Sequence, residues 1–141
     1  MKQETIVGTW RLVSFFGRST TGETRPAFDE KAQGLLVYTA EGYMIANLSA
    51  ASRPPFRSRD FRGGTSEEAL MAVNSYISYC GRYSVSGDTI THHVEMSLYP
   101  NWTGQDQVRH LKFEEDKLTL STPTFNLSGN EWTFELVWQR A

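Results

Sequence analysis

The segment at residues 89–99 alternates apolar and polar side chains without interruption, and this restricts the fold more than any other feature of the chain. Side chains of a strand point alternately to its two faces. One row is apolar except for an imidazole, and it contains Ile90, His92, Val94, Met96 and Leu98. The other row is mostly polar and contains Thr91, His93, Glu95, Ser97 and Tyr99. An imidazole within an apolar row indicates the wall of a ligand cavity, because a plain core would be aliphatic at that position.

Seven further segments have the alternation or the β-branched and aromatic content of strands. They are residues 6–16, 34–39, 42–50, 80–86, 105–114, 117–121 and 131–140. Eight amphipathic antiparallel strands can close into a barrel that holds side chains or one small ligand. A two-sheet sandwich is the alternative. Long alternation at both ends of the chain favours closure, because the first and last strands would otherwise expose their edges.

One inserted helix is predicted at about residues 65–79. Thr65 and Glu68 fit a capping box, and an apolar face recurs at helical spacing from Ala69 to Ile77. We expect this face to cover one end of the barrel. The preceding residues 52–64 carry four arginines, a Pro pair and a Gly pair, which excludes a helix or a central strand. A solvated connector is expected there, with a mobile flap over the cavity mouth as the alternative.

Length and composition exclude several classes of partner. The 141 residues suit one domain, and the net charge of −2 argues against nucleic acid or an anionic membrane surface as the main partner. No apolar run approaches the roughly 18 residues of a membrane span, and the first residues do not lead into a signal segment. Cys80 is the only cysteine, so no intrachain disulfide can form. These features predict a soluble, cytoplasmic protein, and no ligand spacing predicts a metal or another cofactor.

The two ends of the chain resemble lipocalins. Gly8-Thr-Trp10 opens the first strand and Arg140 lies near the end of the last one. The similarity extends to residues 34–43, 79–83, 92–95 and 100–104. Over nearly the whole chain, the pattern resembles the lipocalin-like domain family of small bacterial and fungal proteins, most of which have no assigned function. Secreted lipocalins have a signal peptide and a disulfide and lack the helix, so their extracellular transport role does not carry over.

The resemblance implies an all-β fold, an eight-stranded antiparallel lipocalin-like β-barrel formed by residues 1–141. It also implies structural roles for Trp10 and Arg140. In lipocalins the arginine lies over the tryptophan at the closed end of the barrel. A guanidinium on an indole makes a favourable cation–π contact.

The candidate ligand-binding residues on the strands are His92, Arg109, Tyr43 and Tyr83. In the lumen, His92 is expected to hydrogen-bond a ligand carbonyl or to act as a general base, and a neutral core histidine is the alternative. Arg109 shares a face with apolar residues, so it needs a partner, either a carboxylate of the protein or an anionic ligand group. Tyr43 and Tyr83 are expected to supply hydroxyl groups at the wall.

Two further candidates, Asn101 and Trp102, are expected at the rim of the barrel, after the long strand. The inward face of that strand is assigned from its apolar row. If polar contacts dominate the lumen instead, the assignment reverses, and His93 with Glu95 becomes the site.

The sequence supports two main functional hypotheses. The first is an intracellular barrel that binds a small, largely apolar molecule with one or two polar groups. The second is an isomerase or cyclase in the same cavity, with His92 as acid and base and Arg109 stabilising an enolate-like oxyanion. The second rests on analogy with barrels of related shape in natural-product pathways. A purely structural barrel and a homodimer are further alternatives.

Overall fold

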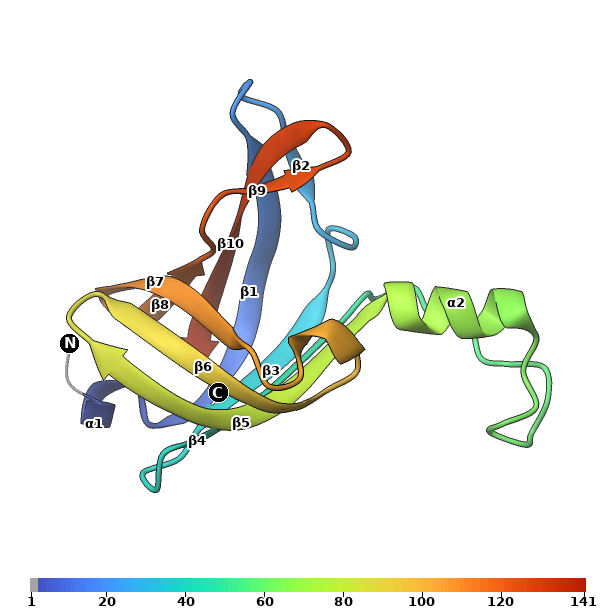
Figure 1. The fold of residues 1–141 in the computed structure, drawn as a ribbon, viewed down its shortest axis with the longest axis horizontal. Coiled ribbons are helices and arrows are strands. Elements are labelled where there is room, and N and C mark those ends of the chain that lie inside the picture. The colour runs from blue at the N-terminus through green and yellow to red at the C-terminus, as the bar shows by residue number, and fades with distance from the viewer. Residues whose placement is uncertain (1–2) are drawn as a thin grey trace.

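The computed structural model describes residues 3–141, and its main feature is a closed antiparallel barrel (Figure 1). The eight barrel strands are β1 (Gly8–Ser19), β3 (Gln33–Tyr38), β4 (Tyr43–Ser49), β5 (Tyr76–Ser86), β6 (Thr89–Ser97), β7 (Asp106–Glu114), β8 (Lys117–Ser121) and β10 (Asn130–Arg140). Each strand pairs with its neighbours, and β1 also pairs with β10. This last pairing closes the ring of eight strands, so the predicted eight-stranded barrel is confirmed.

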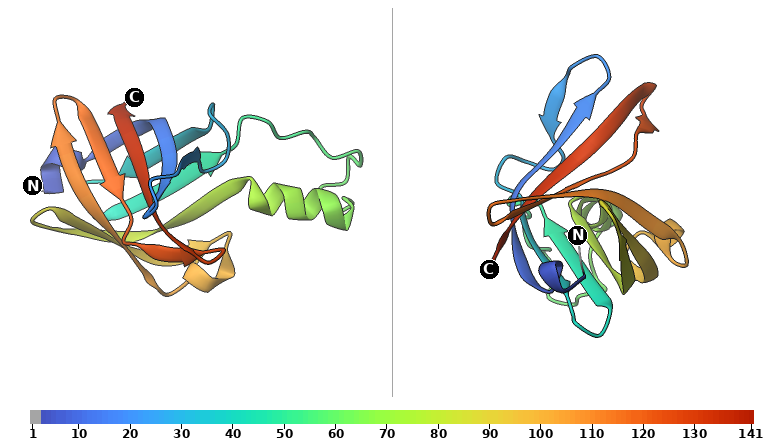
Figure 2. Two further views of the ribbon diagram at one scale, coloured as in Figure 1. Left: turned by 90° about the horizontal axis from the view of Figure 1, so that it is seen from above. Right: turned by 90° about the vertical axis from the view of Figure 1, so that its left-hand side faces the viewer.

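Five short elements complete the fold. They are α1 (Gln3–Ile6), β2 (Thr24–Pro26), α2 (Ser66–Asn74), the 3₁₀ turn η1 (Pro100–Trp102) and β9 (Phe125–Leu127). Strand β2 pairs with residues 16–18 near the end of β1, and β9 pairs with residues 130–132 at the start of β10. These parts of β1 and β10 extend beyond the rest of the barrel (Figure 2). Neither helix is long and apolar enough to cross a membrane, within the residues described.

The end of the barrel beside α1, here called the closed end, is organised around Trp10. Its ring is fully buried and its Nε1 donates a hydrogen bond to the Ile6 carbonyl oxygen at 2.9 Å. The Cζ atom of Arg140 lies 4.3 Å from the centroid of the Trp10 ring, and its guanidinium donates to the carbonyl oxygens of Thr5 and Val7. This is the contact that the resemblance implied, and it seals the closed end.

A β-bulge in β6 corrects one prediction. Ile90, His92 and Val94 face the interior as expected, but Met96 is 66% exposed and Leu98 is 41% exposed. Strand β6 pairs Val94 with Gly81 and Met96 with Cys80, which leaves one residue of β6 unpaired in between. A bulge of this kind shifts the alternation by one residue, so Met96 and Leu98 lie on the outer face.

Helix α2 also differs from its prediction. Its capping box is present: the Thr65 Oγ1 accepts from the Glu68 amide, and the Glu68 side chain accepts from the Thr65 amide. However, the helix ends at Asn74, because Tyr76 already pairs with Ser49 as the first residue of β5. The helix projects away from the barrel and has no buried residue, so it does not cover an end (Figures 1 and 2).

The arginine-rich residues 52–64 run beside α2 and away from the barrel mouth (Figure 1). The Arg53 side chain donates to Ser75 Oγ and to the Ala72 carbonyl oxygen, and the Arg57 amide donates to the Glu68 carboxylate. Most of the segment is exposed. Of the two alternatives, the segment is therefore the solvated connector and not a flap over the barrel.

Candidate ligand-binding site

A buried row of three polar rings crosses the apolar interior of the barrel. His92 of β6 is 2% exposed. Its Nε2 lies 2.6 Å from Tyr38 Oη of β3, and its Nδ1 lies 2.7 Å from Tyr79 Oη of β5. Both tyrosines are buried. Each ring nitrogen therefore has a tyrosine hydroxyl as its partner, and the row links three strands.

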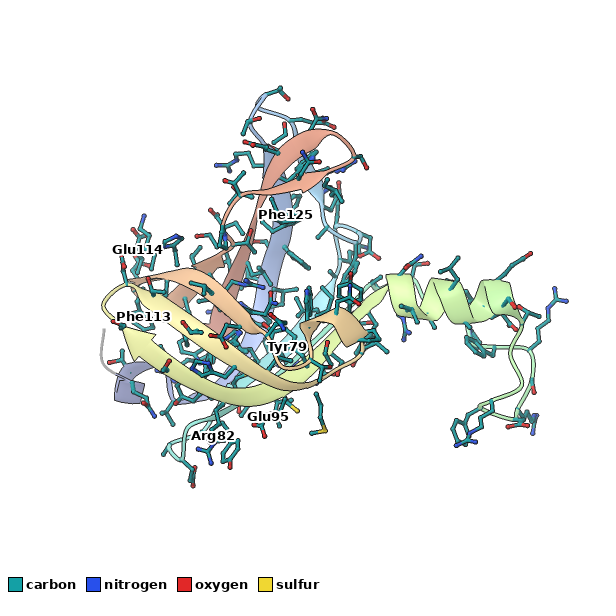
Figure 3. The ribbon with its side chains drawn as sticks, in the orientation of Figure 1. Tyr79, Arg82, Glu95, Phe113, Glu114 and Phe125 are labelled. Carbon is teal, nitrogen blue, oxygen red and sulfur yellow. The ribbon has the colours of Figure 1, made fainter. Side chains whose placement is uncertain are left out.

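Two more aromatic rings extend this row toward both ends of the barrel. The Tyr83 ring lies 4.8 Å from the Tyr38 ring, and its hydroxyl donates to the Thr39 carbonyl oxygen at 2.7 Å. At the other end, the half-buried Trp102 of η1 packs edge-on against Tyr79, with ring centroids 5.6 Å apart. The result is a continuous series of rings from the interior to η1. Figure 3 shows Tyr79 between β5 and η1.

The electrostatics of this row keep its histidine neutral. Burial lowers the pKa of His92 to about 3, and charge repulsion from Arg109 and, to a smaller extent, from His93 acts in the same direction. Burial also raises the pKa values of Tyr38 and Tyr79, so both hydroxyls keep their hydrogens at neutral pH. The row is therefore an uncharged set of hydrogen-bonding groups.

Arg109 lies on the inner row of β7 and is half-buried. Its guanidinium donates to the Gln107 side-chain oxygen at 3.2 Å and to the Val108 carbonyl oxygen at 2.9 Å. It also lies close enough to Tyr79 to lower the pKa of that hydroxyl against the effect of burial. No carboxylate pairs with Arg109 among the residues described. The Arg109 guanidinium therefore lies beside the tyrosine–histidine row and can donate a hydrogen bond to an additional acceptor.

The structure separates the six predicted ligand-binding residues into two groups. His92, Arg109, Tyr83 and Trp102 belong to the ring series or lie beside it. Tyr43 does not: it is 41% exposed on the outer face of β4, where its hydroxyl accepts from Arg82 and its ring lies under that guanidinium. The prediction for Tyr43 is wrong because Met44, Ala46 and Leu48 form the inner row of β4. Asn101 is exposed on η1.

The alternative site at His93 and Glu95 lies on the outer surface. His93 Nδ1 is 2.9 Å from Asp106 Oδ1, and its Nε2 is 3.0 Å from Ser84 Oγ. Glu95 is exposed and is the unpaired residue of the β-bulge; it is labelled in Figure 3. The orientation based on the apolar row of β6 is therefore correct as far as Val94, and the reversed assignment is wrong.

The sequence reasoning missed two residues of the site, Tyr38 and Tyr79. Tyr38 is on a predicted strand, in the same row as Leu36, and only the register of the barrel brings it to His92. Tyr79 fell at the boundary between the predicted helix and the next strand, so its face was not defined. In the structure it belongs to β5, where Gly81 and Tyr83 share its inner row.

No group of three potential metal ligands occurs among the described residues. A hollow, here called the outer groove, lies between α2 and strands β4, β5 and β6, and Tyr79 is among the residues that line it. Its volume is about 680 Å³, and it is lined mainly by apolar side chains, including Ile45, Val73, Met96 and Leu98. The outer groove exists because the β-bulge turns Met96 and Leu98 outward. An apolar lining of this kind is a surface that a binding experiment with an apolar probe has to control for.

We expect the stability of the protein to fall between pH 7 and pH 4.5 because of His92. The unfolded chain takes up a proton on this imidazole near pH 6.5, whereas the folded chain does so only near pH 3. The unfolded state therefore binds more protons in this interval and is favoured as the pH falls. The two values correspond to a loss of about 2.5 kcal/mol over the interval.

The measurement is urea denaturation at a series of pH values for the wild type and for His92→Gln. The wild type should lose about 2.5 kcal/mol more than the variant between pH 7 and pH 4.5. The control is His110→Gln, which removes an exposed imidazole. It shows how far the replacement of a histidine by itself changes the dependence of stability on pH. Equal slopes for the wild type and His92→Gln would contradict the buried neutral state of His92.

Comparisons with known proteins agree with this architecture. Residues 7–141 match a family described as a lipocalin-like domain. A 4'-hydroxy-3'-methoxypropiophenone carrier protein of Aspergillus oryzae, ppsC, is 35% identical over 106 residues, which cover 69% of this chain and 96% of that protein. The crystal structure of a lipocalin-like protein from Bacteroides uniformis superposes with a TM-score of 0.50 at 12% identity, covering 96% of this chain and 98% of that one. At this identity, the structural likeness concerns the fold alone.

Proposed function

Because the chain belongs to the lipocalin-like domain family, we propose that it is a carrier for a small, largely apolar molecule. The molecule binds inside the barrel, beside His92, Tyr79 and Arg109. The observation that carries the proposal is the Tyr38–His92–Tyr79 row. Polar groups set in an apolar interior are typical of sites that orient a mostly apolar ligand.

The Aspergillus oryzae relative supports the size and polarity of this ligand. Its name specifies an aromatic ketone with one hydroxyl and one methoxy group. A molecule of this kind combines an apolar ring with a few oxygen atoms, which suits a barrel of aliphatic and aromatic side chains with one polar row. We extend to this chain only the class, a small aromatic molecule bearing oxygen atoms.

The geometry supports a catalytic role for His92 less well. Both ring nitrogens already have tyrosine partners, and a pKa of about 3 makes the imidazole a weak base at neutral pH. A general base needs a free nitrogen within reach of the proton that it removes. Carriage of the ligand therefore accounts for the site better than isomerisation or cyclisation. The cytoplasmic location and the homodimer stay predictions.

The test is calorimetric titration of the protein with 4'-hydroxy-3'-methoxypropiophenone as the probe. We expect one saturable site per chain. His92→Gln should weaken binding by about tenfold, since removing a group that orders a buried polar row costs on the order of 1.4 kcal/mol.

The matched control is Met96→Gln, which makes the outer groove more polar and leaves the interior unchanged. It should bind the probe as the wild type does. A wild type that does not bind the probe would argue against the proposal. So would a loss of binding in Met96→Gln with none in His92→Gln, because the probe would then occupy the outer groove.

A further inference from the structure

The Tyr38–His92–Tyr79 row has more hydrogens than it can use. Each tyrosine hydroxyl carries one hydrogen and a neutral imidazole carries one, which makes three donors for two hydrogen bonds. If Tyr79 donates to His92, the imidazole donates to Tyr38, and the Tyr38 hydrogen is left over. If the direction is reversed, the Tyr79 hydrogen is left over. A protonated imidazole would leave both. In every case at least one buried hydroxyl hydrogen lacks an acceptor within the row.

No other acceptor in the part of the chain that the structure describes takes up this hydrogen. Arg109 carries only N–H groups and has no acceptor to offer. Among the residues described, Trp138 Nε1 and Ser97 Oγ are buried without a partner. The Trp138 indole can only donate; the Ser97 hydroxyl has one hydrogen and two lone pairs, but it makes no hydrogen bond to the row. Ser97 pairs with Tyr79 across β5 and β6. No aspartate or glutamate is buried among the side chains described. A buried donor without an acceptor costs roughly 1–3 kcal/mol.

We propose that the interior selects its ligand by a hydrogen-bond acceptor: the ligand is an uncharged aromatic molecule with a carbonyl oxygen, and this oxygen takes the surplus tyrosine hydrogen. This inference rests on the proposed carrier function and specifies the ligand class. The carbonyl oxygen has two lone pairs, so it can accept from the tyrosine hydroxyl and from Arg109 together. A molecule of the same shape that lacks an acceptor leaves the surplus hydrogen unpaired.

The test compares two probes of nearly equal shape, propiophenone and propylbenzene, by calorimetric titration. Propiophenone should bind at least about fivefold more tightly, since one neutral hydrogen bond contributes about 1 kcal/mol. In the infrared spectrum of bound propiophenone labelled with ¹³C at the carbonyl, the stretch should move to lower frequency than in hexane, as expected for an oxygen that accepts a hydrogen bond.

Variants identify the donor. The advantage of propiophenone over propylbenzene should decrease several-fold in Tyr38→Phe or in Tyr79→Phe, whichever residue holds the surplus hydrogen. Tyr43→Phe, which removes an exposed hydroxyl from the outer face, is the matched control and should leave the advantage unchanged. Thermal unfolding confirms that each variant is folded, and the infrared measurement on the wild type does not depend on any variant.

The outcomes separate this inference from the proposed function. If both probes bind equally well and the carbonyl stretch stays at its hexane position, the barrel is a carrier but acceptor selection is wrong. If neither probe binds, both the carrier function and the inference are overturned. Equal decreases in Tyr43→Phe and in the two interior variants would also overturn the inference.

Discussion

Replacing Gly81 by alanine should destabilise the protein by about 3 kcal/mol or more, which is enough to prevent folding if the native state is only marginally stable. A Cβ atom at this position would lie 2.0 Å from the His93 carbonyl oxygen and 2.9 Å from the Glu95 amide nitrogen. Both are backbone atoms of β6 at the β-bulge. They can move only if the pairing between β5 and β6 is disrupted, so relieving the clash costs strand hydrogen bonds.

The measurement is the free energy of unfolding of Gly81→Ala by urea denaturation. The control is Gly129→Ala, which has a positive φ of 84° but nothing within 4 Å of the added Cβ atom. It tests backbone strain alone and should cost roughly 1 kcal/mol. If the two variants lose the same stability, the close approach of β5 and β6 is not what restricts this position to glycine.

Truncation of Trp10 to alanine should cost about 3–5 kcal/mol, the range for a large aromatic side chain removed from a packed core. The ring is fully buried, and it packs edge-on against Phe113 with centroids 6.0 Å apart. It also donates a hydrogen bond to Ile6, and Arg140 covers it. One substitution therefore opens a cavity and removes the contacts that join α1, β1 and β10 at the closed end.

Trp102→Ala is the control for this prediction, because Trp102 is a tryptophan that is only half-buried and lies at η1, away from the closed end. It should cost less than half as much in urea denaturation, since less of its surface leaves water on folding. Similar losses for the two variants would show that the closed end does not contribute more to stability than the turn η1.

The sequence alone determined the barrel and much of its interior. Alternation with a period of two is a local property, so it placed Ile90, His92 and Val94 on one face without any knowledge of their partners. The contact between Trp10 and Arg140 could be predicted from the two ends of the chain, and the capping box predicted the start of α2. Each of these features depends on residues close in sequence or on a family pattern.

Only the tertiary structure decided the rest. The β-bulge that turns Met96 outward arises where Gly81 lets two strands approach closely, and alternation within β6 contains no sign of it. Tyr43 and Ile45 looked as suitable for the interior as Met44 until the closed sheet assigned a face to β4. His92 received its partners from residues 54 and 13 positions away in sequence. The register of paired strands decides which side chains face the interior and which of them meet. It joins residues far apart in sequence, so no local pattern encodes it.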